Sequence, residues 1–307
     1  MRTSFSVGYF PDHDNPDEFF SAVKESGIQG IDFNFDIYLT GDKIKSGEFT
    51  PLYNSSLQEM YEFFRPIKES AEKFGIAVVQ AHAPFQAYVD ERDDINERCY
   101  DALEKTFAMT AYLGAKYIVV HPINVAYTKG REYEENVNIE YYKRMIPAAK
   151  KYGVVVLLEN MFSSISRVVS EAVCSDFYQA VRMIDTLNEY AGCELFGFCY
   201  DVGHATLLGK NQRASVNVLG KRIKALHIHD NDNVQDLHAL PYTHTRNWGG
   251  NLVTDWDGFI EGLRDIGYNG DVNFECTTGL SRLPAMVRVA AFAYLNAIGR
   301  YIISRLQ

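Results

Sequence analysis

The chain has 307 residues, of which 47% are hydrophobic and 23% are charged. Such proportions are typical of globular proteins and exclude a collagen-like, mucin-like or largely disordered chain. The formal net charge is −10 and basic residues form no run longer than a pair, so the sequence disfavours nonspecific binding to nucleic acid or to an anionic membrane.

The cysteines and the N-terminal residues indicate the compartment. The cysteines are odd in number and show no Cys-x-x-Cys spacing, which is typical of a reducing compartment: Cys99, Cys174, Cys193, Cys199 and Cys276. The N-terminus contains no apolar core of a signal peptide, and no segment reaches the ~18 uninterrupted apolar residues of a membrane span. We therefore expect a cytoplasmic protein without a membrane segment.

Short apolar or alternating segments recur along the chain, and a longer segment with helical spacing follows each of them. These short segments predict eight strands, at residues 4–10, 28–35, 76–82, 117–121, 154–159, 195–201, 223–229 and 272–275. Apolar stripes with three- and four-residue steps predict helices at 57–74, 95–113, 139–149 and 287–301. The pair Ser56 and Glu59 suits a capping box, and Pro66 predicts a kink or a break in the first of these helices.

Eight strand–helix units without a linker or a change of composition predict one domain over residues 1–307. Eight parallel strands are the number that closes a barrel, so the expected fold is a single (β/α)8 TIM barrel. An open doubly wound sheet is the alternative. It has less support because no G-x-G-x-x-G follows the first strand and no phosphate-binding P-loop motif occurs in the sequence.

Acidic and imidazole side chains stand where six consecutive predicted strands end, which is where a TIM barrel carries its chemistry. They are His82, His121, Glu159, Asp201, His227 with His229, and Glu275. Burying so many ionisable groups around one axis costs several kcal/mol for each unpaired carboxylate, about the penalty that a bound cation removes. Strand alternation places Glu159, Asp201, His227 and Glu275 on inward faces, so we expect these four to bind a divalent metal, one of Mn²⁺, Mg²⁺, Co²⁺ or Zn²⁺.

The order of these motifs resembles the xylose-isomerase-like TIM-barrel superfamily, which includes sugar and sugar-phosphate isomerases and epimerases and the AP endonuclease family 2. The resemblance covers nearly the whole barrel. It rests on His82, His121, Glu159, Asp201-Val202-Gly203-His204, Leu226-His227-Ile228-His229-Asp230, Asp236-Leu237-His238, Asp255-Trp256 and the segment from Gly267 to Glu275.

The resemblance implies roles for individual residues. In single-metal ketose epimerases of this superfamily, the positions of Glu159, Asp201, His227 and Glu275 bind the ion, and the two glutamates are also the acid/base pair. The position of His204 binds substrate. In the endonuclease IV branch, three zinc ions are bound at the positions of His82, His121, Glu159, Asp201, His204, His227, Asp236, His238 and Glu275.

One loop departs from the family pattern. Many relatives have a short Pro-Gly-x-Gly turn before the Asp-Trp pair, whereas residues 241–251 form a longer segment in this chain. A guanidinium suits a phosphate or a carboxylate, so Arg246 in that segment is a candidate to bind one, with a surface role as the open alternative. We therefore expect the substrate-binding residues to be His82, His121, His204, Asp236, His238 and Arg246, and the loop gives no guide to the substrate.

The preferred function is that of a divalent-metal-dependent sugar or sugar-phosphate isomerase or epimerase. It would remove a proton next to a carbonyl through a metal-stabilised enediolate, with Glu159 and Glu275 as the acid/base pair. The alternative is an endonuclease IV-like zinc phosphodiester hydrolase acting on abasic DNA. The expected partner is a small sugar, polyol or sugar phosphate, with nucleic acid disfavoured and a homo-oligomer possible.

Overall fold

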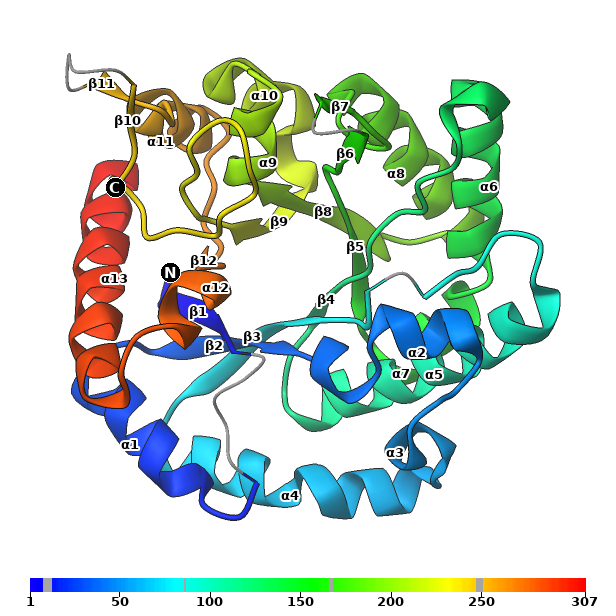
Figure 1. Cartoon of the computed structure of the whole chain (residues 1–307), viewed down its shortest axis with the longest axis horizontal. Coiled ribbons are helices and arrows are strands. Elements are labelled where there is room, and N and C mark those ends of the chain that lie inside the picture. The colour runs from blue at the N-terminus through cyan, green and yellow to red at the C-terminus, as the bar shows by residue number, and fades with distance from the viewer. Residues whose placement is uncertain (8–12, 86, 166–167, 247–250) are drawn as a thin grey trace.

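The computed structural model describes residues 1–7, 13–85, 87–165, 168–246 and 251–307. Eight parallel strands form its central sheet in the order β12-β1-β2-β3-β4-β5-β8-β9 (Figure 1). They are β1 (Thr3–Val7), β2 (Gly30–Asn34), β3 (Ala77–His82), β4 (Tyr117–Val119), β5 (Val155–Glu159), β8 (Phe196–Asp201), β9 (Ile223–His227) and β12 (Val272–Phe274). A parallel bridge between Ile228 and Phe274 connects the last two edges and closes the barrel.

Helices surround this barrel (Figure 1). They are α1 (Pro16–Glu25), α2 (Gly41–Ser46), α3 (Pro51–Asn54), α4 (Leu57–Phe74), α5 (Asp93–Tyr112), α6 (Arg131–Lys143), α7 (Ile146–Tyr152), α8 (Phe177–Ala191), α9 (Val202–Leu207), α10 (Gln212–Leu219), α11 (Trp256–Asp265), α12 (Thr277–Ser281) and α13 (Ala285–Leu306). The (β/α)8 TIM barrel is therefore confirmed, and the open doubly wound sheet is wrong. All eight predicted strands are present, although residues 8–10 of the first prediction lie outside the described residues.

The helix α4 confirms one prediction and contradicts part of another. Ser56 caps it by accepting a hydrogen bond from the Glu59 backbone, and the Glu59 side chain accepts one from the Ser56 backbone, which is the predicted capping box. Of the kink or break predicted at Pro66, the break is absent, because one α-helix runs from Leu57 to Phe74. A kink at Pro66 stays a prediction. Proline removes one N–H from the helix, and the carbonyl of Glu62 that loses this partner belongs to an exposed residue that water can reach.

The single helix predicted over residues 139–149 is two helices in the structure. The helix α6 ends at Lys143 and α7 begins at Ile146, with Pro147 in its first turn. Proline is favoured there because its missing N–H would have no partner within the helix anyway. The apolar periodicity continues across this junction, so it could not reveal the division.

The last helix, α13, is long and apolar enough to cross a membrane by length and composition. Several of its residues nevertheless pack on the barrel. The Phe292 ring stacks on Phe5 of β1 at a centroid distance of 4.6 Å, and Leu295 and Ile302 are fully buried. These contacts indicate that α13 is the final helix of the barrel, as in Figure 1.

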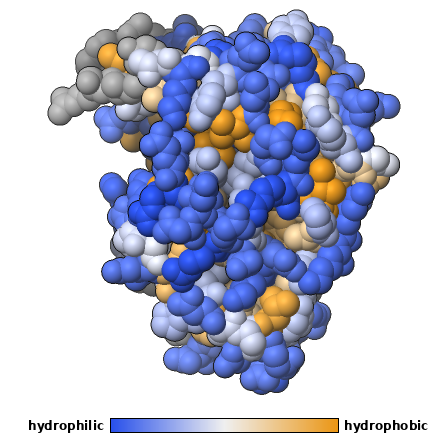
Figure 2. Space-filling model, turned by 90° about the vertical axis from the view of Figure 1, so that its right-hand side faces the viewer, coloured by the Kyte–Doolittle hydropathy of each residue, from blue (hydrophilic) through white to orange (hydrophobic). Residues whose placement is uncertain are grey.

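The interior of the barrel is polar near β1, β2, β3 and β12, where Ser4, Asp32, Gln80 and Asn273 are buried. On the opposite side it is apolar, with a small cluster of Val119, Val155, Leu157, Cys199 and Ala225. The outer surface contrasts with this interior. The face in Figure 2 is mostly hydrophilic, with separate small hydrophobic patches.

Two short antiparallel hairpins follow strands at the carboxyl end of the barrel. They pair β6 (Phe162–Ile165) with β7 (Val168–Glu171), and β10 (Thr245–Arg246) with β11 (Asn251–Leu252). Neither was predicted from the sequence. In Figure 1 the β6–β7 hairpin lies near the end of β5, whereas β10 and β11 lie at the outer edge of the molecule beside α11.

Candidate metal centre

A cavity of about 460 Å³ opens at the carboxyl ends of the strands. Five of the six residues predicted to bind substrate line it, namely His82, His121, His204, Asp236 and His238. Glu159 and Glu275 also reach this cavity, whereas Asp201 and His227 are not among its described lining residues. The two glutamates are therefore the members of the predicted metal site that a molecule in the cavity could contact.

The four predicted metal ligands converge. Glu159, Asp201 and His227 are the last residues of β5, β8 and β9, and Glu275 directly follows β12. One ligand atom from each lies within 4.8 Å of the others, and all four residues are buried. The Nδ1 atom of His227 lies 3.1 Å from Glu159 Oε1 and 3.3 Å from Glu275 Oε2. The structure therefore brings together the set that strand alternation predicted.

A second group shares Glu159. It consists of His82, His121 and Glu159, whose ligand atoms also lie within 4.8 Å of one another. The Nε2 atom of His121 is 2.9 Å from Glu159 Oε2 and 2.9 Å from His82 Nε2. Because Glu159 belongs to both groups, its two oxygens face different sets of ligands.

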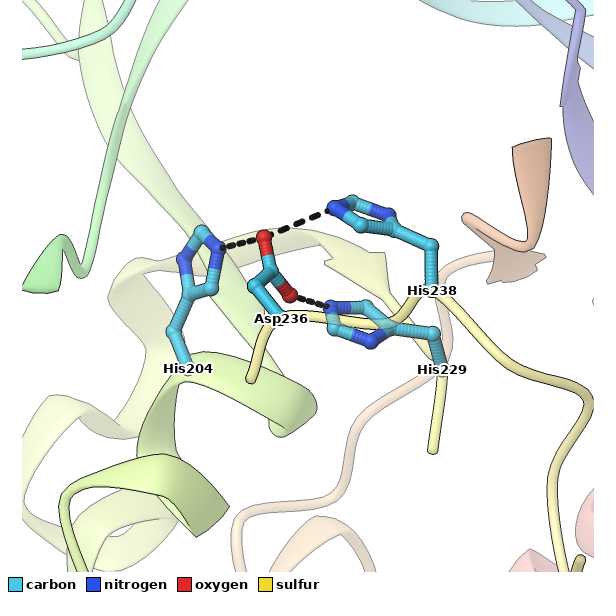
Figure 3. A group of neighbouring side chains, drawn as sticks. All are labelled: His204, His229, Asp236 and His238. Carbon is cyan, nitrogen blue, oxygen red and sulfur yellow. Dashed lines mark hydrogen bonds and ion pairs between the residues drawn. The ribbon is translucent and has the colours of Figure 1, made fainter. Parts of the chain in front are cut away.

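A third group consists of His204, His229, Asp236 and His238 (Figure 3). The Asp236 carboxylate lies between the three imidazoles, at 3.5 Å from His204 Nε2, 3.7 Å from His229 Nε2 and 2.9 Å from His238 Nε2. The His229 and His238 rings stack nearly parallel at 4.2 Å. His229 also lies 3.2 Å from the Asp201 carboxylate, so it connects this group to the predicted metal ligands.

Backbone carbonyls orient three of these histidines. The Nδ1–H groups of His82, His204 and His238 donate to the carbonyls of Ala83, Asn160 and Glu275, at 2.7, 2.8 and 2.7 Å. This places a proton on Nδ1 and directs Nε2 of each ring toward its group, where a bound metal would replace any proton on Nε2. Such hydrogen bonds are a regular feature of histidines that bind metals.

The donor set fits a divalent cation. Glu159, Asp201 and Glu275 bring three carboxylates together with one imidazole, all almost fully buried, and such a concentration of like charge is costly without a cation. Within the described structure, the buried atom Asp236 Oδ1 makes no hydrogen bond, and Glu159 Oε2 faces His121 Nε2 at 2.9 Å. Mixed imidazole and carboxylate ligands suit Zn²⁺ or Mn²⁺ better than Ca²⁺.

The two glutamates experience different environments. Burial would raise the pKa of Glu159, but the neighbouring His227 and His121 imidazoles hold that pKa well below its usual range. Burial raises the pKa of Glu275, and the opposing effect of His227 and His238 does not compensate it. Two carboxyl groups with opposite shifts are the usual arrangement for an acid and a base in one site.

The histidines also differ. Burial and the nearby His121 lower the pKa of His82 to about 3, so this ring is neutral at physiological pH. For His204, the effect of burial is outweighed by Asp201 and Asp236, and the pKa lies well above its usual value. The hydrogen bond with Asp236 likewise overcomes burial at His238 and raises its pKa to about 9.

Among the six residues predicted to bind substrate, Arg246 is the one that is absent from the described lining of this cavity. Its side chain is exposed on the β10–β11 hairpin, where the guanidinium donates to the Val253 carbonyl at 3.2 Å. Its role in binding substrate stays a prediction.

Sequence reasoning missed two residues at the site. His229 had no assigned role, although it shares a strand face with His227, and the structure places it in the third group. Asp32 had no role either, although Gly30, Asp32 and Asn34 alternate toward one face of β2. Its carboxylate is fully buried and lies 3.2 Å from His227 Nε2.

A larger cavity of about 680 Å³ lies at the opposite end of the barrel. Met1, Arg2, Lys221, Lys224 and Asp271 are among its lining residues, and its described lining contains no histidine. Chemistry, rather than size, therefore identifies the cavity at the carboxyl ends as the candidate site.

Comparisons with known proteins agree with this architecture. Residues 20–290 match the family described as xylose isomerase-like TIM barrel. The inosose isomerase of Bacillus velezensis is 26% identical over 166 residues, which are 53% of this chain and 54% of that protein.

Solved structures share the fold at low sequence identity. The 3-keto-D-glucoside 4-epimerase YcjR of E. coli has a TM-score of 0.67 and 18% identity, over 97% of this chain and 99% of its own. The IOLI protein with a bound zinc atom has a TM-score of 0.68 and 17% identity, over 100% of this chain and 99% of its own. A D-psicose 3-epimerase in the presence of D-fructose has a TM-score of 0.66 and 14% identity, over 99% of each chain. Because the family match spans most of its length, this chain belongs to the xylose isomerase-like TIM barrel family.

Proposed function

We propose that this protein is a divalent-metal-dependent isomerase or epimerase of a sugar or sugar phosphate, with Glu159 and Glu275 as its acid/base pair. The observation that carries the proposal is the convergence of Glu159, Asp201, His227 and Glu275 beside the cavity. Of these four, the two glutamates are among the described lining residues of the cavity. Relatives with the same fold are named as sugar epimerases and isomerases, which supports this class of substrate.

The residues suit removal and return of a proton next to a carbonyl. A divalent cation bound by the four residues would supply positive charge that stabilises negative charge developing on substrate oxygens. Glu159, with its lowered pKa, is a carboxylate that can accept a proton, whereas Glu275, with its raised pKa, retains one more readily. The two residues approach the cavity from the ends of β5 and β12, so both carboxyl groups can contact a sugar bound in it.

The other polar residues of the cavity suit the binding of hydroxyl groups. His82, His121, His204, Asp236 and His238 present imidazole and carboxylate groups to the same space. Phe85, Met161 and Phe162 add apolar walls. A few oriented polar groups among apolar walls are typical of small-molecule sites, and they fit a polyhydroxylated ligand.

Deuterium exchange tests this reaction directly. The metal-loaded protein is incubated in D₂O with a panel of ketoses and ketose phosphates, and mass spectrometry follows incorporation at the carbon next to the carbonyl. We expect exchange with at least one sugar, and a loss of about 100-fold or more in Glu159→Gln and Glu275→Gln, the size typical for a general acid or base. Exchange at the wild-type rate in either variant would refute the acid/base role of that glutamate.

Glu134→Gln is the matched control. Glu134 is also buried and its pKa is also raised by burial, but it lies in α6 and is outside the described lining of the candidate site. The substitution should leave the exchange rate unchanged. A similar loss in this variant would point to a general effect of replacing a buried glutamate.

A second function is favoured by one observation. All nine residues that resemble the ligands of zinc phosphodiester hydrolases lie in the three groups, which adjoin one another through Glu159 and His229. The net charge of −10 opposes DNA binding. Incubation of the Zn²⁺-loaded protein with a duplex containing one abasic site tests this second function, since specific cleavage would support the hydrolase and an intact duplex would contradict it.

A further inference from the structure

We propose that Asp32 is a positioning residue, which fixes the proton of His227 on Nε2 and so leaves Nδ1 free to bind a metal. The inference rests on the proposed metal centre, because it concerns how one of its ligands is prepared. Asp32 is not among the predicted ligands and does not reach the cavity in the described structure. It acts, on this proposal, only through His227.

The surroundings of Asp32 show what its carboxylate accepts. Asp32 lies in the middle of β2 with its side chain in the barrel interior and no exposed surface. Its Oδ2 atom lies 3.2 Å from each of three side-chain nitrogens, those of Gln80, Asn273 and His227. The amides of Gln80 and Asn273 can only donate to a carboxylate, so Asp32 is placed as an acceptor for His227 as well.

The two nitrogens of His227 have different partners. Nε2 faces Asp32, whereas Nδ1 faces Glu159 at 3.1 Å and Glu275 at 3.3 Å. A metal-binding imidazole is neutral, with a proton on one nitrogen and a lone pair on the other. In this structure Nδ1 also forms a hydrogen bond with Glu159. Because Asp32 accepts the proton of Nε2, Nδ1 is the nitrogen that would give up its proton to a metal bound in the candidate group.

His227 is oriented differently from the other histidines of the site. In His82, His204 and His238 the proton lies on Nδ1 and a backbone carbonyl accepts it. At His227 the opposite nitrogen is protonated and the acceptor is a charged side chain. A carboxylate increases the basicity of the imidazole more than a carbonyl does, and unlike a carbonyl it can be removed by mutation.

The contact is not a consequence of strand pairing. The strands β2 and β9 are not neighbours in the sheet, and the side chains of Asp32 and His227 meet across the interior of the barrel. The alternative to a positioning role for Asp32 is a purely structural role, since Asp32 also binds Gln80 and Asn273. A structural role and a positioning role predict different effects on metal binding, which the experiments below separate.

The first experiment measures the Kd for Co²⁺ or Zn²⁺ by competition with a chelator. In Asp32→Asn the Kd should rise by about 10- to 100-fold, the usual effect of removing such a partner. Gln80→Met is the matched control, because it removes a donor to Asp32 but leaves the contact with His227, and it should bind metal as the wild type does. An unchanged Kd in Asp32→Asn, or an equal loss in Gln80→Met, would overturn the inference.

The second experiment repeats the Asp32→Asn substitution in protein that lacks the His227 side chain. If Asp32 acts through His227, Asp32→Asn should not weaken binding further in a His227→Ala background. An equal loss in both backgrounds would show that Asp32 has a general structural effect. If the wild type itself binds no divalent metal, the proposed function fails, and this outcome is distinct from a wild type that binds metal with a Kd insensitive to Asp32.

A third measurement requires no variant at position 32. In Zn²⁺-loaded wild type labelled with ¹⁵N-histidine, two-bond ¹H–¹⁵N spectra assign the protonated nitrogen of each ring. The His227 signal, identified by its loss in His227→Ala, should show a proton on Nε2 and the metal-bound shift on Nδ1. A proton on Nδ1 would refute the inference, even if Asp32→Asn failed to fold.

Discussion

Gly203 packs directly against the His229 ring and leaves no room for a side chain. A Cβ atom at position 203 would lie 2.0 Å from Cε1 of His229, and the ring cannot retreat easily because it stacks on His238. We expect Gly203→Ala to destabilise the protein by about 1–3 kcal/mol, the usual cost of overpacking, although alanine is the better helix former. Urea denaturation measures this loss.

The double variant Gly203→Ala/His229→Ala is the control for this explanation. Removing the ring should relieve the clash, so the double variant should be less destabilised than the sum of the two single variants. Additive effects would show that the clash with His229 is not the cause.

Individual site residues could be predicted to different degrees. Glu159, Asp201, His227 and Glu275 could be predicted because strand alternation fixes which side chains point inward, and a barrel makes inward side chains converge. The importance of Asp32 could not be predicted, because its contact with His227 spans 195 positions and depends on distances across the barrel interior. Arg246 was predicted from its charge and loop position, which do not fix where a long side chain points.

At the level of elements, the capping box of α4 has a measurable effect. Ser56→Ala removes the acceptor for the Glu59 N–H and should cost about 1 kcal/mol of unfolding free energy. Glu69→Ala, an exposed position later in the same helix, should change stability much less. Equal stability of Ser56→Ala and the wild type would show that the cap contributes nothing.

Strands and long helices could be predicted because their apolar periodicity extends over many residues. The division between α6 and α7 and the continuity of α4 through Pro66 could not, since both depend on local backbone bonding that periodicity does not record. The hairpins β6–β7 and β10–β11 were missed because they are short and largely exposed, so they lack an alternating buried face.

For the whole molecule, the raised pKa of His238 predicts how stability depends on pH without metal. The hydrogen bond with Asp236 raises this pKa against burial, from 6.5 to about 9. The pair therefore stabilises the folded state fully below pH 6.5, and this contribution is lost as the pH rises through about 9.

Chelator-treated protein should accordingly lose stability to urea between pH 6.5 and 9. A His238→Asn variant should lose less over the same interval, because it lacks the titrating group. If the wild type and the His238→Asn variant changed in stability by the same amount over this interval, the assignment would be contradicted.

The most direct test of the central claim is anomalous diffraction from crystals soaked in Mn²⁺. The account predicts a peak bounded by Glu159, Asp201, His227 and Glu275, at the carboxyl ends of β5, β8, β9 and β12. A map without a peak among these four side chains, or with manganese bound only elsewhere, would contradict it.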